Sequence, residues 1–194
     1  MRITLQHGLA PHHRLPAARL YWQAFGGKLG AVMGPERKAL LFVERVMRDD
    51  HVISAVDAEG RLLGVIGYRT QQGSFVGGSC EDLEAVYGRF GALWRRGALA
   101  VLAHDLAPGE MAVDGLAVTE PARGLGLGAA LVEALCAEAV MRGFTLLRLD
   151  VVGENLRARA LYDRLGFAVS GRADSWLTAA IFGFRSSFSM VREL

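Results

Sequence analysis

The stretch PARGLGLGAALVEAL, residues 121–135, places one arginine and three glycines directly before a segment with helical apolar spacing. A tight turn at the start of a helix leaves several backbone N–H groups unpaired at the positive end of the helix dipole, where phosphate groups bind. Gly124, Gly126 and Gly128 would let a phosphate reach the backbone, and Arg123 offers a forked positive charge beside it. The pattern predicts a phosphate site; the alternative is that the glycines serve only close helix packing and the arginine is solvated.

A dinucleotide-binding turn is a competing interpretation of the same stretch. Gly124, Gly126 and Ala129 satisfy the G-x-G-x-x-A pattern. Asp150 ends the next predicted strand, where a ribose-binding acid belongs. However, residues 119–123 separate the preceding strand from the first glycine, and the chain ends at residue 194, too soon for the second half of a doubly wound sheet. An NAD(P)-type dinucleotide-binding protein is therefore kept as the second interpretation of this phosphate-binding turn.

Apolar spacing and turn residues predict the elements that position these side chains. Helices are expected over 14–25 and 35–49, separated by the glycine-rich segment 26–34, and a hairpin over 51–70. Strands are expected over 2–6, 111–118, 144–151, 167–172 and about 181–191, and helices over 126–142 and 156–165, the first closed by Gly143 and the second capped by Asn155 and ended by Gly166. The pattern indicates an α/β protein.

Two motifs in this order carry a family resemblance. Residues 114–135 hold R/Q-x-x-G-x-G/A after a strand, at Arg123, Gly126 and Gly128. After the next strand, Asn155 is followed by L-Y-x-x-x-G-F, residues 161–167. The chain therefore resembles the GNAT superfamily of acyl-CoA-dependent N-acetyltransferases, closely over residues 110–170.

The resemblance implies a GNAT-like fold, α/β and also describable as α+β, forming a single domain over residues 1–194. Its sheet would be mixed and mostly antiparallel, flanked by helices, and splayed open between the strands ending near Val118 and Val151. The helical-looking segment at about 71–108 departs from the family pattern and is expected to be an insertion between two neighbouring strands.

The resemblance also implies acetyl-CoA as acyl donor, bound in the split of the sheet. Its pyrophosphate would lie on the N–H groups of Gly124, Leu125, Gly126, Leu127, Gly128 and Ala129, with Arg123 as counter-charge. Its pantetheine arm would pair with the backbone of Leu116, Ala117 and Val118, and Asn155 would both cap its helix and touch the cofactor. The expected reaction is direct attack of a primary amine, from a small molecule or a peptide or protein, through a tetrahedral intermediate that a backbone N–H stabilises.

Tyr162 is the first catalytic candidate. It shares one helical stripe with Ala158, Leu161 and Leu165, so its ring points inward. In the family a tyrosine here protonates the leaving thiolate; an ordinary core tyrosine is the alternative. An acyl-CoA-binding domain without turnover is a further alternative, which the intact tyrosine disfavours. Asp150 is the first candidate for general base, because some relatives carry a glutamate there, and Asp114 on the facing strand is the reserve.

The acceptor side has weaker signals. In the family the first two helices border the acceptor pocket, so Tyr21, Trp22, Phe25 and Lys28 are candidates for its lining, with helix packing as the alternative for the aromatic residues. The insertion carries more apolar surface than a solvated loop would keep, at Phe90, Leu93, Trp94, Leu99 and Leu102. This surface predicts a lid over the acceptor, a contact in a homodimer, or packing on its own domain.

Composition excludes several other classes. The net charge is +2, so the sequence predicts neither a nucleic-acid nor a membrane partner. No apolar run approaches the roughly 20 residues that span a bilayer, and no signal-like core begins the chain. With 2 cysteines and histidines that lack ligand spacing, we expect a cytoplasmic protein with no metal.

Overall fold

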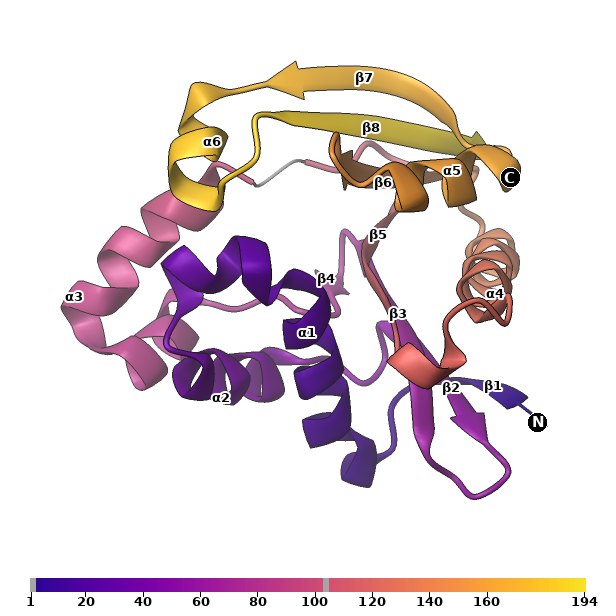
Figure 1. Cartoon of the computed structure of the whole chain (residues 1–194), viewed down its shortest axis with the longest axis horizontal. Helices are drawn as coiled ribbons and strands as arrows, with labels where there is room; N and C mark the ends of the chain where they lie inside the picture. Colours follow the sequence, from indigo (N-terminus) through magenta and orange to yellow (C-terminus); the bar gives the residue numbers. More distant parts are fainter. Residues whose placement is uncertain (1–2, 103–104) are drawn as a thin grey trace.

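The computed structural model describes residues 3–102 and 105–194, so residues 103 and 104 of the predicted insertion lie outside the described part. Within it, an 8-stranded sheet has the order β1-β2-β3-β5-β6-β8-β7, with β4 paired to β3 (Figure 1). The strands are β1 (Ile3–His7), β2 (Val52–Asp57), β3 (Leu62–Thr70), β4 (Gly73–Ser74), β5 (Glu110–Val118), β6 (Leu146–Val152), β7 (Ala168–Asp174) and β8 (Ser186–Glu193). The helices are α1 (Arg14–Met33), α2 (Glu36–Val46), α3 (Cys80–Ala100), α4 (Leu127–Met141), α5 (Leu156–Arg164) and α6 (Trp176–Phe182), with short 3-10 turns η1 (Pro11–His13) and η2 (Glu120–Ala122).

The centre of the sheet is splayed. β5 and β6 run parallel and pair only from Glu110 and Leu146 to Ala112 and Arg148, whereas the other neighbouring strands are antiparallel. Beyond those pairs the two strands separate, which confirms the predicted mixed, mostly antiparallel sheet that opens between them. The opening is where the chain can admit a ligand between two strand edges.

Helices cover both faces of the sheet, with α1, α2 and α3 on one side and α4 on the other (Figure 1). One core cluster joins the first three helices to the sheet through residues such as Phe42, Phe75 and Tyr87. A second cluster joins α4 and α5 to it through Leu131 and Leu135. Burial of these apolar side chains holds the strands that flank the opening in place.

The first helix is longer than its sequence indicates. The predicted break at residues 26–34 is wrong, because α1 continues through the glycines to Met33. Gly26 lies under the Trp22 ring, where an added Cβ would lie 2.8 Å from the indole, and Val32 and Met33 are buried in the core. Their burial outweighs the helix cost of each glycine, about 1 kcal/mol.

Near the end of the chain, the structure also has a helix where the sequence did not predict one. The predicted strand over 181–191 begins only at Ser186, and the preceding residues form α6. The Ser175 side chain caps α6 by accepting hydrogen bonds from the N–H groups of Leu177 and Thr178, and Gly183, with φ of 76°, ends it. This capped turn sets α6 beside α1 (Figure 1).

The insertion forms α3, which begins with a reciprocal cap between Ser79 and Asp82 and is kinked at Gly88 (φ 72°). Leu83 and Tyr87 are buried against the other helices. After the kink, Phe90 is 92% exposed, Leu93 70% and Trp94 48%. The predicted apolar surface of the insertion is therefore divided between packing on its own core and an exposed face. Over residues 3–102 and 105–194, no helix has the length and apolar character needed to cross a bilayer.

Candidate functional site

A cavity of about 390 Å³ occupies the opening between β5 and β6. Its walls come from the diverging parts of the two strands, from the inner stripe of α5 and from the inner stripe of α1, with Leu102, Phe182 and Phe184 at one end. Five side chains predicted for the site converge here: Tyr21, Phe25, Lys28, Asp114 and Tyr162. Asp150, Leu116 and Asn155 also line it.

The glycine turn lies where α4 begins. Gly124 and Gly126 have φ of 83° and 78°, a left-handed conformation that residues with a Cβ rarely adopt, and Gly126 is the N-cap of α4. The first hydrogen bond of the helix runs from the Ala130 N–H to the Gly126 carbonyl at 3.0 Å, so the N–H groups of residues 127–129 precede it and remain free. Arg123 is exposed at the mouth of the turn, and its Nε donates to the Val118 carbonyl at 3.2 Å.

The edge of β5 that faces the opening offers backbone groups. The Thr119 N–H donates to the Leu63 carbonyl on β3, so the neighbouring Val118 turns its polar groups away from β3. Leu116, two residues earlier, presents its N–H and carbonyl to the same edge. Ala117 pairs with Val65 and turns its backbone toward β3. Of the three residues expected to pair with pantetheine, only Leu116 and Val118 therefore turn their backbone groups to the opening.

Tyr162 projects from α5 into the cavity, as its helical stripe predicts. It is 8% exposed, and its ring packs edge-on against Phe167. Burial raises the pKa of its hydroxyl to about 12. The phenol therefore keeps its proton throughout the neutral range.

Asp114 occupies an irregular position in β5. The pairing with β3 shifts from Gly67–Gly115 to Tyr68–Val113, which leaves Asp114 as the extra residue of a bulge. Its Oδ2 accepts a hydrogen bond from the Val76 N–H at 2.8 Å. Burial raises the pKa of the carboxyl to about 6, against the opposing effects of this hydrogen bond and of the charges of Arg69 and His51. The bulge thus supplies the cavity with a carboxylate that titrates near neutrality.

Asp150 and Asn155 lie on the opposite wall. Asp150 is exposed; the Ser189 hydroxyl donates to its Oδ1 at 2.5 Å, and Arg148 Nη2 lies 3.6 Å from the same oxygen. Asn155 caps α5 as predicted, since its side chain accepts from the Ala158 N–H at 3.2 Å, and it also lines the cavity. Asp150 is thus engaged at Oδ1 by Ser189 and Arg148, whereas Asp114 lines the cavity and is held by backbone donors of residues 75 and 76.

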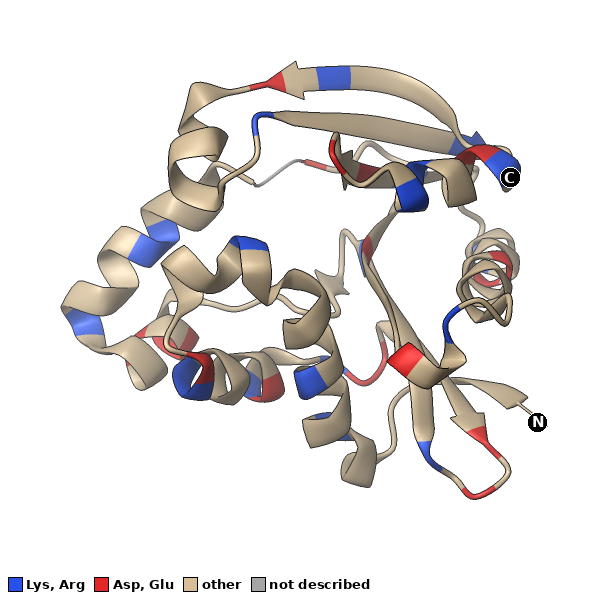
Figure 2. Cartoon of the chain, viewed as in Figure 1, with Lys and Arg blue, Asp and Glu red and all other residues tan. Residues whose placement is uncertain are grey.

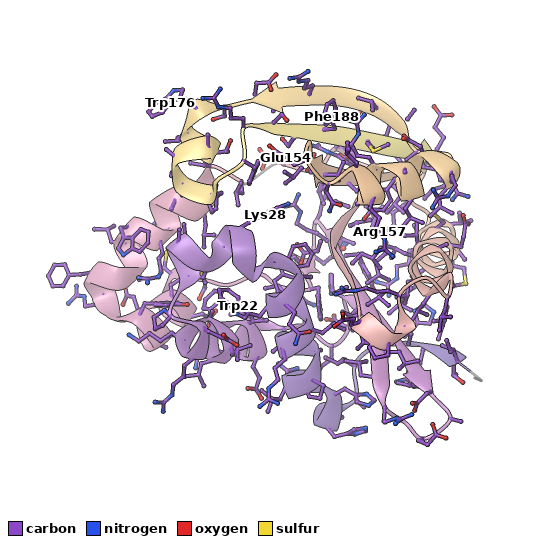
Figure 3. All side chains as sticks on the ribbon, viewed as in Figure 1. Trp22, Lys28, Glu154, Arg157, Trp176 and Phe188 are labelled. Atoms are coloured by element: carbon purple, nitrogen blue, oxygen red, sulfur yellow. The ribbon has the colours of Figure 1, made fainter. Side chains whose placement is uncertain are left out.

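Three of the four acceptor candidates line the cavity. Tyr21, Phe25 and Lys28 do so, and the rings of Tyr21 and Phe25 lie 4.6 Å apart. Burial and the charge of Asp114 both raise the pKa of Tyr21. Trp22 does not line the cavity; it covers Gly26 on α1, so the packing alternative holds for this residue (Figure 3).

Phe182 and Phe184 also line the cavity, although no sequence pattern singled them out. The Ser175 cap and Gly183 were available as signals of a helix end there, but the helix spans only 7 residues. Across residues 3–102 and 105–194, no group of three or more His, Cys, Asp or Glu side chains is arranged to hold a metal ion.

The model of the acetyltransferase (GNAT) family matches residues 15–167. The chain belongs to the GNAT family. It is an acyltransferase enzyme, and acetyl-CoA is the donor that members of this family generally use. Both recognised motifs lie inside the matched range.

A curated GNAT relative is the "5-NmdU N-acetyltransferase" of Pseudomonas phage PaMx11, which is 45% identical over 58 residues. That match covers 30% of this chain and 39% of the relative, so it spans well under half of the phage protein. It supports the family and leaves the acceptor of this enzyme open.

Solved structures agree with the fold. The ribosomal-protein-S18-alanine N-acetyltransferase of Escherichia coli has a TM-score of 0.60 at 18% identity, over 99% of this chain and 94% of its own. A GCN5-related N-acetyltransferase from Kribbella flavida has 0.63 at 17% identity, over 99% and 98%. An N-acetyltransferase from Staphylococcus aureus Mu50 has 0.67 at 15% identity, over 97% and 100%. At these identities the likeness shows the GNAT fold alone.

Proposed function

We propose that this enzyme, acting as one domain over residues 1–194, transfers an acetyl group from acetyl-CoA directly to a primary amine. The observation that carries the proposal is the convergence, in one opening of the sheet, of a protonated phenol on α5 and a carboxylate on β5. Amine acetylation requires a proton acceptor, a proton donor and a site for the acyl donor. This family member has a carboxylate, a phenol and a glycine turn with unpaired N–H groups that can fill these roles.

The residues around the opening fit acetyl-CoA. The turn at 124–129 offers free N–H groups at a helix start, which suit a pyrophosphate, and Arg123 adds a positive charge. Leu116 and Val118 present backbone groups along the cleft edge, which suit the amides of pantetheine. We assign the holding of the donor to these residues, with Asn155 at the inner end of the cavity.

The proposed chemistry divides between two side chains. Acetyl-CoA, when bound, supplies the activated acetyl thioester. An amine of pKa near 10 must lose a proton before it can attack, and Asp114 is ionised above about pH 6 and can accept that proton at Oδ1 or Oδ2. Tyr162 holds a proton at Oη that it can donate inside the cleft, and the Leu116 N–H offers a hydrogen bond to developing negative charge.

We place Asp114 ahead of Asp150 as general base, which reverses the order suggested by the sequence. The Asp150 carboxylate already accepts from Ser189 at Oδ1, and Arg148 lies near the same oxygen, so one of its two oxygens is engaged. Asp114 has the raised pKa that a base working near neutrality needs. Asp150 then serves to shape the wall opposite α1.

We also propose that the exposed face of α3, defined as Phe90, Leu93 and Trp94, is covered by a second copy of the chain. Acidic residues 81, 82 and 84 precede the kink at Gly88, and basic residues 89, 95 and 96 follow it. Two such helices packed antiparallel about a twofold axis would place opposite charges against each other. The dimer would bury side chains that water now reaches.

An amine panel tests the proposed activity. Small amines, amino acids, aminoglycosides and peptides with free N-termini are incubated with acetyl-CoA, and released thiol is measured. Thiol release that requires both enzyme and amine supports the proposal. Stabilisation by acetyl-CoA without thiol release from any amine would instead favour a binding domain without turnover, and stabilisation by NADH alone would favour a dinucleotide site.

A further inference from the structure

The inner stripe of α1 ends in a lysine. Tyr21, Phe25 and Lys28 follow at i, i+4 and i+7, and all three line the cavity. Figure 3 shows Lys28 extending from α1 toward the turn that carries Glu154. The glycine turn and α4 lie on the other side of the sheet, so this cation is far from the proposed phosphate site (Figure 1).

The cavity continues beyond Lys28 toward α6. A neighbouring cavity of about 250 Å³ shares Leu102, Phe184 and residues 150–152 with the first and reaches Ser175 and Thr178. Its wall is mostly apolar, as is the wall around Lys28, which includes Phe25 and Leu29. An acceptor in this space would therefore have an apolar or aromatic body.

Lys28 is the one cation among the described residues that line either cavity. Its side chain is half-buried, and no carboxylate of the described residues lies within ion-pair distance of it. Its Nζ lies 5.9 Å from the centroid of the Phe184 ring. Burial lowers the pKa of Lys28, and the charge of Glu154 partly opposes that effect. A half-buried ammonium group without a counter-ion is unfavourable, and a ligand anion would relieve that cost.

Lys28 and the proposed base Asp114 lie near different turns of α1. Tyr21, whose pKa responds to the charge of Asp114, stands seven residues before Lys28, which is about 10 Å along the axis of α1. A ligand that places its amine at Asp114 and an anion at Lys28 must span a good part of that distance. A carboxylate carries one negative charge, which the single positive charge of the lysine would neutralise.

We propose that the acceptor of this enzyme is an amino acid in the broad sense, in which an apolar or aromatic body separates the reacting amine from a carboxylate that Lys28 binds. The inference rests on the proposed acetyl transfer, because it takes the amine end of the ligand to lie at Asp114. Lys28 acts here as a specificity-determining residue.

The probes are 4-(aminomethyl)benzoate and 4-(aminomethyl)benzamide, which have the same shape and differ by one negative charge. Calorimetric titration of each into the enzyme saturated with coenzyme A measures binding without turnover. We expect the benzoate to bind at least tenfold more tightly than the benzamide. In Lys28→Met that preference falls to within twofold because benzoate binding weakens, in Lys28→Arg most of it remains, and the benzamide affinity changes little in either variant.

Lys38→Met is the matched control, because Lys38 is exposed on α2, away from both cavities, and should leave both affinities unchanged. A thermal melt verifies that each variant folds. Equal binding of the two probes, no binding of the benzoate, or an undiminished preference in Lys28→Met would overturn the inference.

Parallel measurement of thiol release separates this inference from the proposed function. Selective benzoate binding without thiol release from any amine would uphold the anion site and contradict the acetyl transfer. Thiol release at equal rates from the benzoate and the benzamide, with equal affinities, would uphold the transfer and contradict the anion site.

Discussion

The two sides of the cavity use different parts of the chain. On the donor side, formed by β5, α4 and α5, the groups proposed to hold the ligand are mostly backbone N–H and carbonyl groups. On the acceptor side, formed by α1, α6 and the end of the insertion, they are the side chains of Phe25, Lys28 and Phe184. A backbone site needs glycines at set positions, so it leaves a pattern in the sequence. A side-chain site can be built from many sequences, so it leaves almost none.

The largest expected effect lies in the glycine turn. Gly126→Glu should abolish the rise in melting temperature produced by acetyl-CoA, because it puts a side chain and a negative charge where the phosphate is expected and strains a residue with φ of 78°. Gly143→Glu is the matched control, since Gly143 has φ of 80° at the opposite end of α4 and open space around it. If acetyl-CoA still raises the melting temperature of Gly126→Glu, the glycine turn is not the donor's phosphate site.

The next effect concerns a side chain on the donor side. Tyr162→Phe should lower the turnover number by about a hundredfold while leaving acetyl-CoA affinity nearly intact, because only the proton donor is lost. Tyr87→Phe is the control: it removes a buried hydroxyl that donates to the Met33 carbonyl at 2.5 Å, far from the cavity, and should change stability rather than turnover. Single-turnover kinetics measure the rate of the chemical step. If that rate is unchanged in Tyr162→Phe, Tyr162 is a packing residue and not the proton donor.

An effect no larger than this, at the low end of the roughly hundredfold or more that a general base contributes, is expected at the base. A base must be ionised to act, so kcat/KM should fall as pH drops below about 6, the pKa of Asp114, and level off above it. Asp114→Asn should lower the plateau and remove this limb of the pH profile. Asp150→Asn should lower the rate less and keep the limb. If the fall in kcat/KM at low pH persists in Asp114→Asn and disappears in Asp150→Asn, Asp150 is the general base, as the sequence suggested.

The smallest effect on catalysis is expected at the exposed face of α3. Replacing Phe90 and Leu93 together by Ser should halve the mass measured by light scattering and leave turnover within about twofold, because neither residue lines the central cavity. Trp176→Ser is the control, since Trp176 is 79% exposed on α6, outside the proposed contact (Figure 3). A wild-type protein that already has the mass of one chain would contradict the dimer.

Charge gives little further help on partners. Lys and Arg are spread over many elements rather than gathered into one patch (Figure 2). The basic residues are thus scattered over the structure, as they are along the sequence.

Residues 110–167 were predictable because local signals and tertiary structure agree there. Asn155 caps α5 with its own side chain, and Gly143 and Gly166 each have φ of 80° just past a helix. The break predicted at residues 26–34 failed because Gly26 and its neighbours are held in α1 by contacts with Trp22 and the core, which a local pattern does not contain.

The candidate site shows the same limit. The inward direction of Tyr162 followed from helical spacing and its catalytic role from the family resemblance. The proposed advantage of Asp114 over Asp150 depends on a bulge in β5 and on the Val76 N–H, which comes from a distant part of the chain. Lys28 was predictable as a lining residue only through the family. Whether a carboxylate pairs with it depends on every element that surrounds it, and none of the described residues provides one within ion-pair distance.

The short pairing of β5 with β6 has a mechanical consequence. Three residue pairs join the two strands, whereas β6 and β8 share seven. Among the strands on the main path of the sheet this is the shortest ladder, so we expect the sheet to bend most readily along this seam, as a hinge between a half that contains the N-terminal strands and a half that contains β6, β7 and β8. A ligand wedged into the seam would stiffen the hinge, and amide hydrogen exchange would slow first at the strand residues beside it.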